Sequence, residues 1–350
     1  MSIIAANAEP NTKTGLWHLV LAGVLWGAGG LTGSLLARHT GLAAPAVATY
    51  RLGVGGLLLV LFFLLSRRPL PRGRQAWTRI AVLGVLAAEF QASYFAAVER
   101  VSVSLATLLT IGASPILVLA VEAATGRRRL TRRALVTVLL ALTGLTLLIG
   151  VPDGRRDLPT LLAGGGFALL AAAGFATLTL VGSRPVDGLD DLAGTGTGFT
   201  LGAVLLLPFA TAAGGLAFTP SASGLGLLLL LGVGPTAIAY AAYFRGLRSA
   251  QPATAALMAL VEPLVGTALS VVILGDRLAL AGWAGAALLI VALVRESRRS
   301  QSGSRPGVAG GRSTSGPSAA ARSTVGTLKP MKPYRMSSSG LSRLKKQNGR

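Results

Sequence analysis

Three ionisable side chains lie near the middle of long apolar stretches: Arg51, Glu89 and Glu262. If these stretches cross a bilayer, each charge costs a few kcal/mol or more, so we expect each to face a cavity or a partner. Two roles are open for Arg51, which either contacts an anionic group of a substrate or pairs with Glu89 and holds the bundle together. Glu122 lies at the end of its stretch beside Arg127–Arg129, where an interfacial ion pair is expected.

Prolines interrupt the same apolar stretches. Pro263 directly follows Glu262 and has no N–H, so it is predicted to open the backbone carbonyl of Ala259 as an acceptor at the depth of the carboxyl group. Pro115 is predicted to open the carbonyl of Ile111 in an earlier stretch in the same way. Paired breaks of this kind are typical of a binding site between two structural repeats. The alternative interpretation is that the prolines only bend helices for packing.

Polar and aromatic side chains at similar depths complete a set of candidate site residues. The candidates for a substrate cavity or for ion coupling are Trp26, Arg51, Glu89, Tyr94, Ser114, Tyr240, Tyr243 and Glu262. The predicted helix-breaking residues are Pro115, Pro235 and Pro263. Enzyme motifs such as a phosphate-binding loop or a zinc-binding H-E-x-x-H are missing from the sequence, so we predict no catalytic residue, metal site or cofactor.

The chain contains an internal duplication. Pro115 and Leu130 stand 148 positions before Pro263 and Leu278, and five apolar stretches fall within each period. A period of this length indicates a duplicated half-protein. Because five is odd, the second half must cross the bilayer in the opposite orientation to the first, which is the inverted-repeat architecture of many secondary transporters.

Ten apolar stretches are long enough to cross a hydrocarbon core, which takes about 20 helical residues. They are residues 16–37, 42–65, 78–99, 103–124, 131–150, 158–181, 190–213, 222–247, 252–275 and 279–297. The least regular is 190–213, which begins with small and polar residues. The sequence therefore predicts an all-α polytopic membrane protein with ten transmembrane helices in two inverted five-helix repeats, at residues 16–150 and 151–297.

Composition agrees with this class, since 52% of the residues are apolar and only 13% are charged. The net charge of +21 is concentrated: of the 33 Lys and Arg residues, ten lie in Arg67–Arg79 and Arg127–Arg133 and twelve lie after Glu296. Basic loops and tails of this kind attract anionic lipid headgroups, and we do not expect nucleic-acid binding. The chain has no cysteine, so disulfides and thiolate chemistry are excluded.

The distribution of arginine predicts the orientation. If residues 1–15 are a cytoplasmic segment, the predicted inner loops hold 13 arginines and the predicted outer loops hold 5. The positive-inside rule then places both termini in the cytoplasm of a protein of the plasma membrane. Residues 298–350 are rich in Ser, Gly, Pro and basic residues, which predicts a disordered, basic cytoplasmic tail.

A series of short motifs resembles one transporter superfamily. The motifs are Trp26-Gly27, Pro45 with Tyr50-Arg51, Tyr94-Phe95, Ser114-Pro115, Glu262-Pro263 and Leu274-Gly275-Asp276. In this order they resemble the drug/metabolite transporter superfamily and, within it, the EamA-type transporters, over about residues 16–297. The usual glutamate after Leu-Gly is Asp276 here, and the equivalent position of the first half is Arg128.

The resemblance implies a central cavity and the export or exchange of a small polar or amphipathic metabolite. The run 256–263 is similar to that of amino-acid exporters, so an amino acid is one candidate substrate. Two other classes stay open, a membrane-embedded enzyme and a non-transporting scaffold or sensor. The first should show clustered His, Asp or Cys at an interface, and the second has no use for the intramembrane charges. A homodimer is an open possibility for the assembly.

We expect Glu89 and Glu262 to line the cavity and at least one of them to change its protonation or partner during transport, which makes a proton the candidate coupling ion. An amino acid would direct its carboxylate towards Arg51 and its ammonium group towards a glutamate. Glu262 is the better candidate for this contact, because its counterpart Ser114 is neutral and the shared fold therefore does not require the charge.

The predicted topology can be checked with reporter fusions. A reporter joined after Arg74 should lie in the cytoplasm and one joined after Arg156 outside it, because three predicted spans separate the two sites. Alkaline phosphatase and a fluorescent protein, active on opposite sides of the membrane, give the two readouts. The same compartment for both fusions would contradict the topology.

Overall fold

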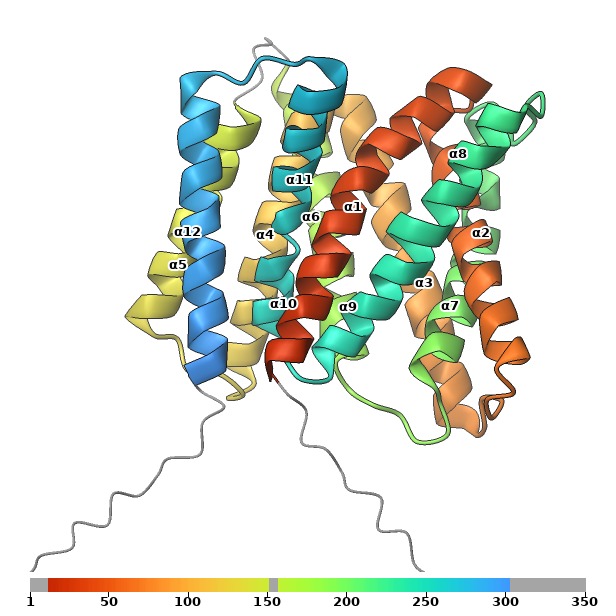
Figure 1. The fold of residues 1–350 in the computed structure, drawn as a ribbon, viewed down its shortest axis with the longest axis horizontal. Helices are drawn as coiled ribbons and strands as arrows, with labels where there is room; N and C mark the ends of the chain where they lie inside the picture. The colour runs from red at the N-terminus through yellow and green to blue at the C-terminus, as the bar shows by residue number, and fades with distance from the viewer. Residues whose placement is uncertain (1–11, 151–156, 303–350) are drawn as a thin grey trace, which may run out of the picture. The chain divides into compact units, whose positions relative to one another are not determined.

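The computed structural model describes residues 12–150 and 157–302, which form a bundle of helices with no strand in these ranges (Figure 1). The elements are α1 (Thr12–Thr40), α2 (Ala44–Leu65), α3 (Arg74–Arg100), α4 (Val103–Ala124), α5 (Arg132–Ile149), α6 (Leu158–Gly182), α7 (Asp191–Ala212), α8 (Ala222–Gly232), the π-helix η1 (Val233–Ile238), α9 (Ala239–Leu247), α10 (Pro252–Met258), α11 (Val261–Leu269), the π-helix η2 (Ser270–Leu274) and α12 (Leu280–Ser302).

Within the described residues, ten segments are long and apolar enough to cross a membrane. The eighth segment combines α8, η1 and α9, and the ninth combines α10, α11 and η2. The irregular stretch 190–213 forms α7, which confirms its prediction as a helix. α12 continues to Ser302, beyond the predicted boundary at 297. Residues 303–350 of the predicted tail and residues 1–11 lie outside the described part of the chain.

Polar side chains begin five of the helices. The N-cap residues whose side chains accept a hydrogen bond from a backbone amide of the first turn are Ser102, Thr131, Asp157, Asp190 and Ser221. At Asp157 the hydrogen bonds from Thr160 hold the pKa of the carboxyl below its ordinary value. These caps satisfy amide groups that a helix leaves without internal partners, so they mark where the chain enters the apolar region.

The two membrane faces of the bundle carry different parts of the chain. α1 begins and α12 ends at the lower end of the bundle in Figure 1, as an even number of crossings requires. We call this end the terminal face. It also carries the connections 66–73, 125–131, 183–190 and 248–251. The opposite end, the distal face, carries the connections 41–43, 101–102, 213–221 and 275–279.

Helix packing follows the two-fold relation of the repeats. In the first repeat α3 and α4 pack on α6. Their equivalents in the second repeat, the eighth span and α11, pack on α1, which is the equivalent of α6. α2 packs on its equivalent α7, and α5 on its equivalent α12. The helix starts keep the sequence period, because Arg74 of α3 and Ala222 of α8 are 148 positions apart, as are Arg132 of α5 and Leu280 of α12. The ten spans are thus two inverted five-helix repeats.

The expected symmetry of the helix breaks is wrong. α4 runs through Pro115 without interruption, whereas the equivalent ninth span is divided at Ala259 and Leu260 and ends in η2. Next to Pro115, the Ser114 hydroxyl donates to the carbonyl of Thr110 at 2.6 Å, whereas the carbonyl that loses its helical donor to the proline is that of Ile111. The interruptions are therefore confined to the second repeat in the described residues.

α5 and α12 cross through bare backbone. A Cβ atom built on Gly285 of α12 would lie 2.6 Å from the carbonyl oxygen of Gly144 on α5, and one built on Gly144 would lie 2.7 Å from the amide nitrogen of Leu289. Backbone atoms in a helix cannot move aside as a flexible side chain can. The crossing therefore requires glycine on both helices, as in other close contacts between membrane helices.

Substitution of Gly285 tests this crossing. Gly285→Ala should lower the free energy of unfolding by about 1–3 kcal/mol, because the added methyl group meets backbone. Gly166→Ala is the matched control, since a Cβ at Gly166 of α6 would have no neighbour within 4 Å. Thermal unfolding in detergent should show a lower midpoint for the first variant alone. Equal midpoints would contradict the crossing as described.

Candidate functional site

A cavity of about 810 Å³ lies inside the bundle and is lined by both repeats. Small-molecule sites typically enclose ~300–1,000 Å³. At one end its lining includes Val103, Asp276 and Arg277, which are exposed at the distal face. At the other end it includes Trp26 and Tyr240, which are buried. The cavity therefore opens to the distal face and ends inside the bundle.

Most of the residues selected from the sequence line this cavity. The predicted residues in its wall are Trp26, Arg51, Tyr94, Ser114, Tyr240, Glu262 and Pro263. Tyr243 lies behind the wall, where its ring centroid is 5.0 Å from that of Trp26 and its hydroxyl shares a hydrogen bond with Thr179 at 2.8 Å. Tyr243 thus supports the aromatic floor without facing the cavity.

The floor of the cavity is aromatic. The ring of Trp26 meets Tyr240 edge-on at 5.0 Å and Phe175 at 5.9 Å, and Phe90 lies 5.7 Å from Phe175. The indole N–H of Trp26 is buried and has no acceptor among the described residues. Because a buried tryptophan N–H usually finds a partner, this donor is a candidate contact for a ligand in the cavity.

Arg51 is anchored on a defect in the eighth span. Pro235 has no N–H, so the carbonyl of Leu231 loses its usual helical donor and accepts instead from the Thr236 hydroxyl at 2.9 Å. The same hydroxyl oxygen accepts from Arg51 Nε at 3.3 Å, and the Pro235 carbonyl accepts from Nη2 at 3.5 Å. The proline break thereby positions a guanidinium from another helix, and neither contact occupies Nη1.

Glu262 stands in the first turn of α11, next to the division of the ninth span. The carbonyl of Ala259, predicted to be an open acceptor, accepts from the Glu262 amide at 2.9 Å, so that prediction is wrong. A tight turn at the helix start satisfies the oxygen that Pro263 would otherwise leave free. The carboxylate lines the cavity, and no described residue forms an ion pair with it.

Glu89 does not line the cavity, which corrects its prediction. Its Oε1 accepts from the Ser93 hydroxyl at 3.0 Å, and its Oε2 packs against Gly174 of α6 in space that a side chain at that position would fill. The Arg51–Glu89 pair, one of the two roles left open for Arg51, is not formed, because no ion pair in the described residues joins the two side chains. Arg51 on α2 faces the eighth span, whereas Glu89 on α3 faces α6.

The cavity wall on α3 and α4 is held by hydrogen bonds between polar side chains and neighbouring helices. The Tyr94 and Thr107 hydroxyls share a hydrogen bond of 2.8 Å. The Ser114 hydroxyl also lies 3.4 Å from the Ala172 carbonyl, and Thr110 donates to the Ala168 carbonyl at 3.1 Å, so both join α4 to α6. Ser114 is therefore occupied with backbone and differs in role from its charged counterpart Glu262.

Sequence reasoning missed several residues that shape the site, among them Thr236 and Phe175. Thr236 follows Pro235, and a hydroxyl next to a proline that frees a carbonyl is a recognisable signal. Phe175 carries no such signal, because a phenylalanine in an apolar helix is typical of lipid contact or packing. Among the described residues, no group of three His, Asp or Glu side chains is placed to hold a metal ion.

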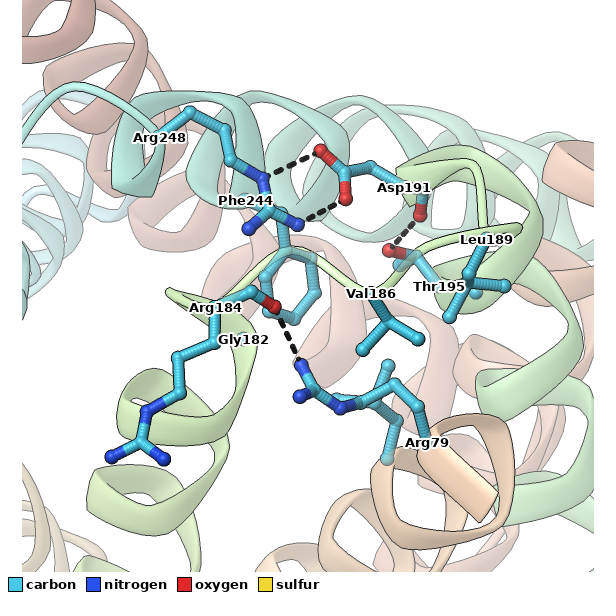
Figure 2. Close-up of a pocket in the computed structure, with 11 residues that line it drawn as sticks. Arg79, Gly182, Arg184, Val186, Leu189, Asp191, Thr195, Phe244 and Arg248 are labelled. Atoms are coloured by element: carbon cyan, nitrogen blue, oxygen red, sulfur yellow. Dashed lines mark hydrogen bonds and ion pairs between the residues drawn. The ribbon is translucent and has the colours of Figure 1, made fainter. Parts of the chain in front are cut away.

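The terminal face is closed by polar contacts. Figure 2 shows Arg248 directed at both carboxylate oxygens of Asp191 and Arg79 directed at the carbonyl of Arg184. Arg79 Nη1 donates to this carbonyl oxygen at 2.9 Å. The space between these residues is about 20 Å³, room for one water molecule. This pocket is thus too small for a metabolite. Its contacts join α3 to the end of α6 and the end of α9 to α7, beneath the cavity.

Two inverted repeats of five membrane helices around a largely apolar cavity with a few charged and polar side chains define a multi-pass membrane transporter that takes a small-molecule substrate. Comparison with protein families gives the same answer in more detail. The chain belongs to the EamA-like transporter family, which matches residues 13–150 and again residues 162–295. This confirms the resemblance found in the motifs and places one family unit on each repeat.

Individual relatives cover most of the chain. It is 29% identical to "Uncharacterized transporter YwfM" of Bacillus subtilis over 79% of its own length and 91% of the relative's. It is 26% identical to "Uncharacterized inner membrane transporter YicL" of Salmonella typhimurium over 81% and 95% of the two chains. A crystal structure that is 18% identical superimposes with a TM-score of 0.67 over 82% of this chain and 98% of that one, which supports the fold.

The anchor of Arg51 predicts a specific effect of the Thr236 hydroxyl. Thr236→Val removes the donor to Leu231 and the acceptor of Arg51 in a buried site, so the free energy of unfolding should fall by about 1–3 kcal/mol. Thr236→Ser keeps the hydroxyl, so its free energy of unfolding should fall much less. Thermal unfolding in detergent measures both, and equal losses would show that shape, not the hydrogen bonds, holds this region.

Proposed function

We propose that the chain is a secondary transporter that exports or exchanges a small zwitterionic metabolite, with an amino acid as the leading candidate, by alternating access between its repeats. The observation that carries the proposal is the pair Arg51 and Glu262, which line the same cavity and form no ion pair with each other in the described residues. Each charge is thus free for one end of a ligand that bears both signs.

The chemistry of the two ends follows from the side chains. A guanidinium presents planar donors that match a carboxylate, and Thr236 and Pro235 hold that of Arg51 in place. Glu262 offers a carboxylate to an ammonium group. The rings of Trp26 and Phe175 supply an apolar surface for the remainder of an amphipathic ligand.

The closed and open faces support alternating access. The cavity opens to the distal face, whereas the terminal face is joined by ion pairs and hydrogen bonds, which corresponds to one end state of such a cycle. When the open face changes, the hydration of Glu262 and its separation from Arg51 change too, so its protonation can follow the cycle. Glu262 is therefore the proposed site of proton coupling.

The arginine distribution supports a plasma-membrane protein with both termini in the cytoplasm. The connections of the terminal face carry most of the loop arginines, including Arg67, Arg72 and Arg127. The terminal face is then the cytoplasmic one, and its arginines bind anionic lipid headgroups. In this orientation the structure corresponds to an outward-open state.

A set of matched ligands tests the zwitterion proposal. Proteoliposomes loaded with an apolar amino acid, such as leucine or phenylalanine, should exchange it for the labelled amino acid. They should not exchange it for the N-acetyl derivative, which lacks the ammonium group, or for the amine that lacks the carboxylate. Glu262→Gln and Arg51→Gln should each lower the exchange rate about tenfold or more, as expected for loss of a contact to a charged group.

Glu89→Gln is the matched control, because Glu89 is an intramembrane carboxyl outside the cavity and its variant should exchange close to the wild-type rate. A pH gradient should alter net transport in the wild type and not in Glu262→Gln. If purified Glu262→Gln transported at the wild-type rate with unchanged pH dependence, the role of Glu262 would be wrong. Exchange of the N-acetyl derivative at the rate of the amino acid would contradict the zwitterion assignment.

A further inference from the structure

Outside the cavity, a buried ionic cluster joins four parts of the chain near the terminal face. Arg128, in the connection between α4 and α5, donates to Glu296 of α12 at 3.1 Å and lies 4.0 Å from the carboxylate of Glu122 on α4. Glu296 also accepts from the Thr254 hydroxyl of α10 at 2.7 Å, and Glu122 accepts from the Ala253 amide at 3.1 Å. The side chains of Arg128 and Glu296 are 6% and 1% exposed.

The cluster confirms the expected pairing of Glu122 with the Arg127–Arg129 run, but it is buried and reaches α12, which the sequence did not indicate. It is also incompletely satisfied. Arg128 Nε and Nη1 are buried without a hydrogen-bond partner in the described residues, and Glu296 Oε2, which also lacks a hydrogen bond there, forms an ion pair with Arg299 at 3.7 Å. A buried charge without its full set of hydrogen bonds raises the free energy of the closed state. Water that entered this site would supply the missing hydrogen bonds.

The internal repeat identifies the equivalent of this cluster at the other face. At the 148-residue period that aligns α5 with α12, Glu122, Arg128 and Glu296 correspond to Ser270, Asp276 and Leu148. All three of these counterparts line the cavity that opens to the distal face. The same structural element is therefore closed at the terminal face and open at the distal face.

The two copies differ in charge. At the terminal face Arg128 lies between the carboxylates of Glu122 and Glu296, and Arg299 also pairs with Glu296. At the distal mouth the residues equivalent to Glu122 and Glu296 are the neutral Ser270 and Leu148, beside Asp276. Closing the distal mouth by the same packing would not form equivalents of the Arg128–Glu122 and Arg128–Glu296 ion pairs. The ion pairs thus favour one of the two closed faces.

We propose that Glu122, Arg128 and Glu296 form a lock that holds the terminal face closed, and that exchange of the open face separates them and brings Ser270 and Asp276 against Leu148. This inference rests on the proposed alternating access and adds to it the residues of both gates. Because only one gate is ionic, the lock biases the substrate-free protein towards the state open at the distal face.

The absence of cysteine makes the bias measurable. Thr267→Cys places the only thiol in the cavity wall, where a membrane-impermeant maleimide reaches it from the distal side. In intact cells, Arg128→Gln in this background should lower the labelling rate roughly fivefold or more, since the population open at the distal face falls when its stabilising contact is lost. In inside-out vesicles labelling should rise. Glu296→Gln tests the same lock and leaves Arg128 its contact with Glu122.

Arg68→Gln is the matched control for charge. It removes one arginine from an ion pair of 2.8 Å with Asp190 at the terminal face, but this pair is outside the lock and its arginine is 43% exposed. Its labelling rate should equal that of the Thr267→Cys parent. A reduction as large as that of Arg128→Gln would show a general effect of charge at this face and overturn the lock.

The reverse experiment gives the distal gate a cation. Ser270→Lys provides a partner for Asp276 when the distal mouth closes, so labelling of Thr267→Cys from the distal side should slow, whereas Ser270→Asn should leave it unchanged. Wild-type rates in Arg128→Gln, Glu296→Gln and Ser270→Lys would overturn the inference. Labelling needs no substrate, so shifted rates in a protein that exchanges no zwitterion would refute the substrate proposal and leave the lock intact.

Discussion

Hydrocarbon offers no hydrogen bonds, so each polar group inside this bundle depends on a partner in the protein or on the aqueous cavity. The eighth span illustrates the constraint most clearly. Pro235 has no amide hydrogen, so the Thr236 hydroxyl donates to the carbonyl of Leu231 in its place. The Thr236 hydroxyl oxygen also accepts a hydrogen bond from Arg51 Nε. The repair of a backbone defect and the placement of a charge in the cavity are one arrangement, so neither can vary independently of the other.

The membrane spans were predictable because apolar character accumulates over a whole helix. Even α7, with its small and polar start, carries enough apolar length to be recognised. The internal duplication added the relation between the halves, since the period that aligns Pro115 with Pro263 also aligns the starts of α5 and α12. Length and period are properties of the chain alone, and both were correct.

The side-chain contacts were less predictable, because sequence gives the depth of a residue but not the neighbour that its helix face meets. Arg51 and Glu89 lie at similar depths, yet one faces the eighth span and the other faces α6. Only packing between helices sets that rotation. The effect of Pro115 was also not predictable, because whether a proline interrupts a helix depends on the packing of the neighbouring helices, and α4 stays continuous where the equivalent ninth span is divided.

The glycine crossing of α5 and α12 has a mechanical consequence. Helices that interlock through large side chains must change rotamers before one can shift past the other, and such changes occur in discrete steps. Where Gly144 and Gly285 meet, the touching surfaces are smooth backbone, and no rotamer has to change for the helices to tilt. The contact therefore prevents these two equivalent helices from moving closer at this point, whereas no interlocked side chain opposes a change of the angle between them.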